Sequence, residues 1–180
     1  MNLLRDSARL RATLATLLVS ACGGRDADAG PWQFEVDTVR SETGGGIRQH
    51  SWLRAVGKEG PEGKSRTQAV ILSFDCFPGN ASSTIMTQQA LRQGSVDTRV
   101  TLDAAPPRRI PAFAGTTPTG GQVVLTIPQD SVLAILSGHQ RAVIEYADGA
   151  GSFRTVAEFP LTGLEKYRRP FLAACAERGE

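Results

Sequence analysis

Hydrophobic and polar residues alternate along most of this chain from residue 32 onward. A two-residue period is typical of strands that have one buried and one solvent-facing side. The clearest case is VDTRVTLD at residues 96–103, where every second residue from Val96 to Leu102 is expected to face inward. The same pattern predicts strands at residues 32–39, 69–76, 122–127, 141–147 and 152–159.

Two further segments have weaker patterns. Residues 47–56 (IRQHSWLRAV) favour a strand over a helix, and residues 84–91 (TIMTQQAL) fit either a strand or one turn of helix. Between the strands, stretches rich in glycine, proline and small polar residues predict turns and loops. These loops are expected at residues 41–46, 57–68, 78–84, 104–121 and 148–151.

A period of three to four residues replaces the alternation in two places and predicts short helices. DSVLAILSG at residues 130–138 has Asp130 as a plausible N-cap and Gly138 as a plausible stop. The second helix follows a turn at residues 160–163 and ends near Cys175. Its inward face would carry Leu164, Tyr167, Phe171 and Cys175.

Strands following one another through short turns, with few helices between them, favour antiparallel pairing over parallel crossovers. The fold class predicted is therefore mainly β (α+β). We expect an antiparallel sheet, or a sandwich-like β domain, with two short helices packed over it. Residues 31–180 would form this single domain.

The first 21 residues do not fit that domain. Three arginines precede a short apolar run, ATLATLLVSA, as in a secretory signal peptide. Val19-Ser20-Ala21-Cys22 resembles a bacterial lipobox, in which Cys22 would be lipidated and become the mature N-terminus. Residues 22–30 would be a flexible tether. The alternative is cleavage at Ala27-Asp28-Ala29, which would release a soluble periplasmic protein.

Removing the leader changes the charge balance. Residues 1–21 hold three Arg and one Asp, so 17 basic and 17 acidic side chains remain of the 20 and 18 in the full chain. A neutral domain has no electrostatic attraction for nucleic acid, whose binding depends on neutralising phosphates. The membrane, through the N-terminal lipid, and an envelope protein or cell-wall component are the expected partners. With Gly23 after the cysteine, the outer membrane is the expected location.

Three cysteines occur in the chain, and with Cys22 assigned to lipid an even pair remains. Cys76 and Cys175 both lie on the inward faces of their predicted elements. In an oxidising compartment this favours one disulfide that ties the last helix to a central strand. Two buried free thiols are the competing interpretation.

The sequence shows no established catalytic, nucleotide-binding or metal-binding motif. His50 and His139 are expected to be surface polar residues, and neither lies near a cysteine, so we expect no catalytic residue, cofactor or metal. A triad assembled in space would escape this test. Trp32 and Trp52 are expected in the core, although a tryptophan near a flexible loop can anchor an interface. One interaction loop is proposed around Pro106, Pro107, Arg108, Arg109 and Phe113.

The order of these features resembles the VasI/TagO family of small periplasmic proteins associated with type VI secretion. The matching residues are WQFEVD at 32–37, LSFDC at 72–76, VDTRVTLD at 96–103, and AEFPLTGL at 157–164 followed by Cys175. Departures are SETGGG after the first strand and the absence of a tryptophan after the 96–103 strand. The resemblance implies a sheet–helix–disulfide domain and suggests a role beside a secretion system.

Three functions stay open from the sequence. The first is a non-enzymatic binding or accessory module of the envelope. The second is an inhibitor or ligand-binding lipoprotein, similar in format to periplasmic lysozyme inhibitors. The third is a hydrolase, which would need His50 or His139 in a deep pocket beside an acid and a nucleophile. We expect the first.

Overall fold

The structure is a computed structural model that describes residues 31–40, 47–77, 80–118, 120–147 and 154–176. The predicted signal peptide, Cys22, the tether and the turns at residues 41–46 and 148–151 lie outside these residues. No helix among the described residues is long and apolar enough to cross a bilayer.

Nine strands and two helices make up the described chain. The strands are β1 (Trp32–Arg40), β2 (Ile47–Pro61), β3 (Gln68–Phe77), β4 (Asn80–Thr87), β5 (Gly94–Leu102), β6 (Arg108–Thr117), β7 (Gly120–Leu125), β8 (Arg141–Ala147) and β9 (Arg154–Pro160). The helices are α1 (Gln129–Leu136) and α2 (Leu164–Ala176).

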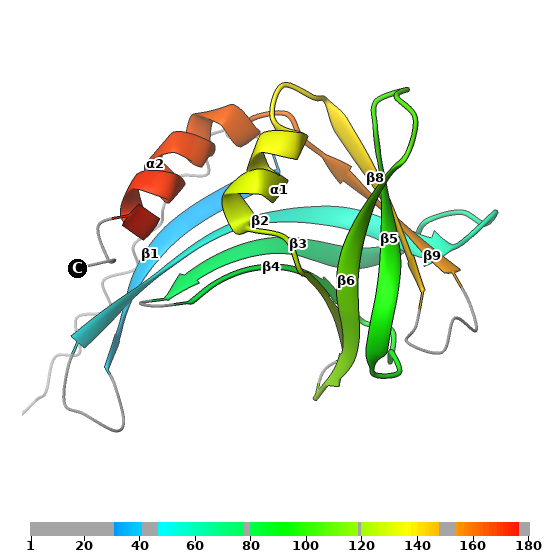
Figure 1. The fold of residues 1–180 in the computed structure, drawn as a ribbon, viewed down its shortest axis with the longest axis horizontal. Coiled ribbons are helices and arrows are strands. Elements are labelled where there is room, and N and C mark those ends of the chain that lie inside the picture. Colours follow the sequence, from blue (N-terminus) through cyan, green and yellow to red (C-terminus); the bar gives the residue numbers. More distant parts are fainter. Residues whose placement is uncertain (1–30, 41–46, 78–79, 119, 148–153, 177–180) are drawn as a thin grey trace, which may run out of the picture.

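All nine strands belong to one antiparallel sheet with the order β1-β2-β3-β4-β7-β6-β5-β8-β9. A further pairing between β2 and β9 closes the strands from β2 to β9 into an eight-stranded barrel (Figure 1). The prediction of an antiparallel, mainly β fold is confirmed. The sheet closes on itself instead of stacking as two layers, because the long strand β2 has neighbours on both edges.

One edge of β2 is shared between two strands. β1 pairs with Ile47–Ala55 and β9 pairs with Lys58–Pro61, so Val56 and Gly57 lie between the two ladders. β1 and the first half of β2 therefore extend beyond the barrel, and their inner side needs a cover. Helix α2 lies over this extension, and α1 packs beside it against β4 (Figure 1).

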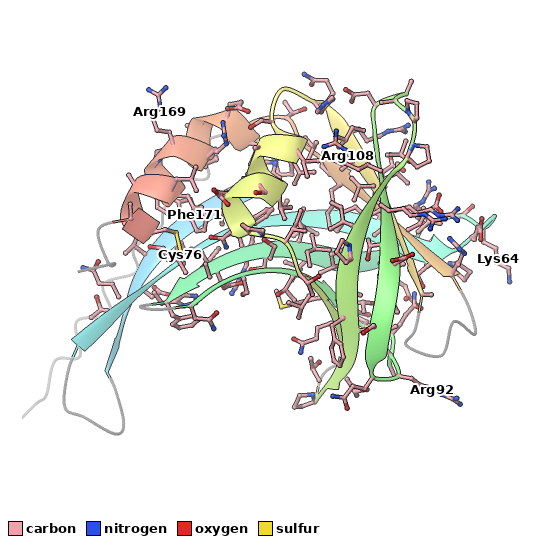
Figure 2. All side chains as sticks on the ribbon, viewed as in Figure 1. Lys64, Cys76, Arg92, Arg108, Arg169 and Phe171 are labelled. Atoms are coloured by element: carbon pink, nitrogen blue, oxygen red, sulfur yellow. A yellow bond between two sulfur atoms is a disulfide. The ribbon has the colours of Figure 1, made fainter. Side chains whose placement is uncertain are left out.

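The core is continuous from the barrel to the helices. Trp32 on β1 stacks on Phe74 of β3 with ring centroids 6.2 Å apart, and Phe34 meets Phe171 of α2 edge to face at 6.1 Å. Figure 2 shows Phe171 pointing from α2 toward the sheet and Arg169 pointing away from it. The predicted inner face of α2 is confirmed: Leu164 and Phe171 are buried, while Tyr167 and Cys175 pack against the core.

The prediction of a charged loop at residues 57–68 is wrong over its first half. Gly57–Pro61 continue β2, and Lys58–Pro61 make the ladder that closes the barrel. The prediction failed because Glu59 faces inward, where alternation predicts an apolar residue. Glu59 is fully buried and accepts hydrogen bonds from the hydroxyls of Thr87 and Tyr146, which offset the cost of burying a carboxylate.

The prediction of a loop at residues 104–121 is also wrong, because Arg108–Thr117 form the barrel strand β6. Pro111, which argued against a strand, lies at the end of the ladder with β7. Its carbonyl oxygen accepts from Thr126 N–H at 3.0 Å. Proline has no backbone N–H, so it donates no bond in return. Small inward residues, Ala112 and Ala114, fill the crowded interior at this strand.

Two smaller corrections concern the turn at 78–84 and the first helix. β4 begins at Asn80, inside the predicted turn. Residues 84–87 belong to the same strand and do not form a turn of helix. Helix α1 begins at Gln129 after Pro128, and Asp130 is not the N-cap; its carboxylate accepts from Ser131 N–H instead. Gly138 follows the helix with a φ of 78°, as the stop signal predicted.

Candidate functional site

The predicted disulfide is confirmed. Cys76 at the end of β3 and Cys175 in the last turn of α2 are bonded, with their Cα atoms 5.8 Å apart and a sequence separation of 99. The bond fixes α2 across the inner face of the sheet extension. Inward-facing strand and helix positions were the signal that located both cysteines.

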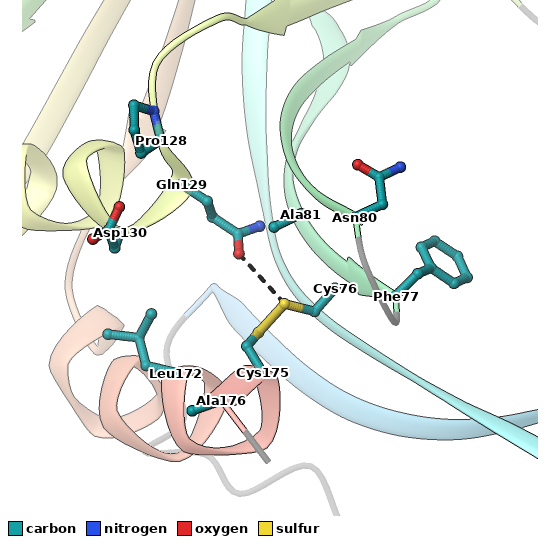
Figure 3. Close-up of a pocket in the computed structure, with 10 residues that line it drawn as sticks. All are labelled: Cys76, Phe77, Asn80, Ala81, Pro128, Gln129, Asp130, Leu172, Cys175 and Ala176. Atoms are coloured by element: carbon teal, nitrogen blue, oxygen red, sulfur yellow. Dashed lines mark hydrogen bonds between the residues drawn. A yellow bond between two sulfur atoms is a disulfide. The ribbon is translucent and has the colours of Figure 1, made fainter. Parts of the chain in front are cut away.

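A pocket of 560 Å³ lies directly beside this bond (Figure 3). Its walls are the adjoining ends of β3 and β4, the start of α1 and the last turn of α2. Gln129 holds these elements together, since its Nε2 donates to the carbonyl oxygens of Asp75 at 3.2 Å and Ser82 at 2.7 Å. Its Oε1 lies 3.6 Å from Cys76 Sγ, which carries no proton in the disulfide. The amide group of Gln129 is thus used in joining the elements.

The opposite, outer face of β1, β2 and β3 carries a connected set of aromatic and charged side chains. We call this set the outer-face array. It consists of Asp37, His50, Trp52, Arg54, Asp75 and Phe77. The strand pairing places them together, because Asp37 lies opposite His50, and Trp52 lies opposite Asp75.

Ion pairs and stacking hold the array in one arrangement. Arg54 Nη2 donates to Asp75 Oδ1 at 3.2 Å, and the guanidinium carbon lies 4.3 Å from the centre of the Trp52 ring. Trp52 Nε1 donates to Asp37 Oδ2 at 3.3 Å. His50 Nε2 lies 3.1 Å from the same Asp75 oxygen, and its ring stacks on Phe77 with centroids 3.9 Å apart. Phe77, 44% exposed, also lines the disulfide pocket, so the array reaches the rim of that pocket.

A serine lies beside this histidine and aspartate, but the order of contacts is not that of a nucleophilic triad. Ser73 Oγ donates to Asp75 and accepts from Arg54 Nε at 3.1 Å, so the carboxylate lies between serine and histidine. A general base must contact the nucleophile's own proton. Ser73 is also fully buried. The arrangement positions Arg54, and the hydroxyl donates to the carboxylate of Asp75 and not to the imidazole of His50.

The proposed interaction loop is a turn followed by a strand. Pro106 and Pro107 lie in an exposed turn, whereas Arg108, Arg109 and Phe113 belong to β6. Arg109 Nη1 pairs with Asp97 Oδ2 at 3.5 Å on the exterior, and Phe113 is half-exposed farther along the strand. The structure spreads these residues along one barrel strand.

The histidines and tryptophans differ from expectation in part. His50 is largely buried against Asp75 and is not a free surface residue. His139 lies near the surface, with Nδ1 2.9 Å from Asp103 Oδ2. The hydrogen bond with His139 is the main cause that lowers the pKa of Asp103 below its ordinary value of 3.8. Trp32 is in the core as predicted, whereas Trp52 is on the outer face.

Sequence reasoning missed Arg54, Asp75 and Gln129. The available signal for Arg54 and Asp75 was that both occupy outward-facing positions in the alternating patterns of β2 and β3. Their types alone suggest ordinary solvated charges, and the cross-strand register that joins them was unknown. The described residues contain no group of three or more His, Cys, Asp or Glu arranged to hold a metal ion.

No family model matches the chain, and no curated protein sequence matches it. Among solved structures, the chain is similar to the crystal structure of invasion associated protein B from Bartonella henselae. The TM-score is 0.49 and the identity 12%, over 78% of this chain and 92% of the other. A likeness of this size carries no functional assignment, and the resemblance to the VasI/TagO family stays a prediction.

Proposed function

We propose that this chain is a non-enzymatic binding module of the bacterial envelope, tethered by a lipid on Cys22, and that the outer-face array contacts a protein partner. The observation that carries the proposal is the array itself. Tryptophan and arginine are the residue types that dominate protein interfaces. Here both lie on a sheet face that neither described helix covers.

The fixed arrangement of the array supports binding. Arg54 is held by Asp75 and Ser73 and lies over Trp52, so its rotamer is already restricted before a partner arrives. Immobilising a flexible side chain costs about 0.5–1.5 kcal/mol on association, and a pre-ordered array avoids much of that cost. Phe77 adds exposed apolar area at one end of the array.

The envelope location is supported by the leader and by the disulfide. A stable disulfide between Cys76 and Cys175 is typical of proteins in oxidising compartments such as the periplasm. The family resemblance adds a type VI secretion component as the partner proposed for the module.

The lipid anchor is tested by replacing its attachment site. Cys22→Ala should abolish incorporation of a labelled fatty acid and move the protein from the membrane fraction to the soluble fraction. The double variant Cys76→Ser/Cys175→Ser is the control and should keep its label. Unchanged labelling and fractionation of Cys22→Ala would refute the anchor.

The contact surface is tested by array variants of the full chain, with binding measured as the partner protein retained from solubilised envelopes. Trp52→Ala and Arg54→Ala should each reduce retention of the same protein at least tenfold, because hot-spot truncations cost about 2 kcal/mol or more. Arg169→Ala, on the outward side of α2, is the matched control and should change nothing. Equal retention by all variants would contradict the proposal.

A further inference from the structure

A second pocket, of 620 Å³, opens on the outer wall where β1 and β9 meet along β2. The strand junction creates it, because β1 leaves β2 at Ala55 and β9 joins at Lys58. We call it the junction pocket. Its lining includes Val56, Lys58, Arg66, Arg141, Glu158 and Pro160.

Positive charge predominates in the junction pocket. Glu158 is the one carboxylate among its lining residues, and it bridges two arginines: Arg66 Nη1 at 3.0 Å and Arg141 Nη1 at 3.3 Å. Lys58 lies opposite Glu158 in the β2–β9 register and has no ion-pair partner among the described residues. Three cations against one carboxylate leave a net charge of about +2 in the pocket at neutral pH.

The arginines have donors left over. A guanidinium carries five N–H groups in a planar fork, which matches the two oxygens of a carboxylate or phosphate. Arg66 Nε is buried and has no hydrogen-bond acceptor in the described part of the chain. A buried donor without an acceptor is unfavourable, so an oxyanion that draws the Arg66 guanidinium toward itself would supply the missing bond.

One side of the junction pocket is apolar. Val56 is 53% exposed, which is high for a large aliphatic residue on a strand, and Pro160 lies near it in the lining. A pocket of this volume has room for more than an inorganic ion. The ligand that fits therefore has an anionic head and an apolar body.

We propose that the junction pocket binds an oxyanion group, a carboxylate or a phosphate, through Arg66, Arg141 and Lys58, with the ligand's apolar part against Val56 and Pro160. Glu158 occupies the two guanidiniums in the absence of ligand and competes with the ligand for them. This site shares no residue with the outer-face array and does not depend on the array's partner.

The test is ligand-observed NMR on the full-length protein at constant ionic strength, with inorganic phosphate and octanoate as probes and chloride as the non-specific anion. For each probe that binds, the signal should reach a plateau as the probe concentration rises. Arg66→Gln and Arg141→Gln should each weaken binding about tenfold, whereas Arg169→Gln should leave it unchanged. Binding of octanoate alone identifies an amphiphilic carboxylate as the ligand class, and binding of phosphate identifies a phosphate group.

Glu158→Gln separates binding from a structural role. Removing the carboxylate that competes for both arginines should tighten binding of the probe severalfold, although it removes two ion pairs. Thermal unfolding of each variant confirms that it is folded. The proposal would be overturned if neither probe bound saturably, or if chloride displaced or mimicked the probes equally well. Identical affinities in the wild type and the arginine variants would also overturn it. Weaker binding in Glu158→Gln would do so as well.

Discussion

The side chain of Asp103 connects β5 and β8, two paired strands that are far apart in sequence. It follows β5 with a φ of 50°, a left-handed conformation that aspartate tolerates better than most residues. Its carboxylate accepts from the backbone N–H groups of Gln140 and Arg141 at 3.0 Å each and contacts His139. This residue therefore sets where β8 begins relative to β5.

The pKa of Asp103 gives the first prediction. Because the His139 contact and the backbone donors hold the folded-state pKa below 3.8, the carboxyl contributes stability above the unfolded pKa. That contribution is lost as the pH falls through the lower, folded pKa. Replacing His139 with alanine should raise the pKa of Asp103, as measured by NMR titration of its carboxyl carbon. A pKa that is the same in both proteins would contradict the assignment.

Gly57 lies at the junction between the β1 and β9 ladders and has no room for a side chain. A Cβ there would lie 2.3 Å from the carbonyl oxygen of Glu158 and 2.6 Å from the Phe159 ring. Only glycine lets β9 approach β2 closely enough to close the barrel.

Gly57→Ala should lower the free energy of unfolding by about 1–3 kcal/mol, the usual cost of overpacking. Gly115→Ala is the matched control, because it is also in a strand but its nearest neighbour to a new Cβ is 3.9 Å away. Urea unfolding measures both variants. Similar losses for the two would mean that closure at β2–β9 is looser than the structure shows.

At the scale of elements, α2 is the part of the fold that depends most on a single covalent bond. Pro170 lies inside this helix and cannot donate a backbone hydrogen bond there, so packing must compensate. Phe171 supplies buried apolar contact, and the bond from Cys175 to Cys76 fixes the last turn.

Cys76→Ser and Cys175→Ser should each lower the free energy of unfolding by about 2–5 kcal/mol, the usual cost of losing a native disulfide. The double variant should be no less stable than either single variant, because all three lack the same bond. Equilibrium unfolding under non-reducing conditions measures this. Losses that add in the double variant would contradict a shared bond.

An element could be predicted from the sequence where its hydrophobic pattern was regular, and was missed where a proline or a buried charge interrupted that pattern. The β3, β5 and β8 strands alternate cleanly, and α2 keeps its inner face despite Pro170, so these were predicted. β6 was missed because its segment is rich in proline and glycine, which predicts a loop, and the pairing that accommodates Pro111 is known only from the structure. The closing half of β2 was missed because Glu59 is a buried carboxylate, whose partners Thr87 and Tyr146 come from other strands.

The whole molecule combines a closed barrel with a one-sided extension. Helix α2 covers the inner face of the extension, with α1 beside it against β4, so the outer face is left to solvent and carries the outer-face array. The inward-facing positions of Cys76 and Cys175 predicted the clamp between β3 and α2. The array depends on the register of three strands, which the sequence does not encode locally, and so it could not be predicted.

Site-specific photo-cross-linking in living cells tests the central claim of a partner-binding array most directly. A photoreactive phenylalanine derivative at position 52 keeps an aromatic ring on the outer face, and the same residue at Arg92, in the exposed turn after β4, is the control. The account predicts one discrete cross-linked protein from position 52, diminished by Arg54→Ala and absent from position 92. No adduct from position 52, or the same adducts from both positions, would contradict it.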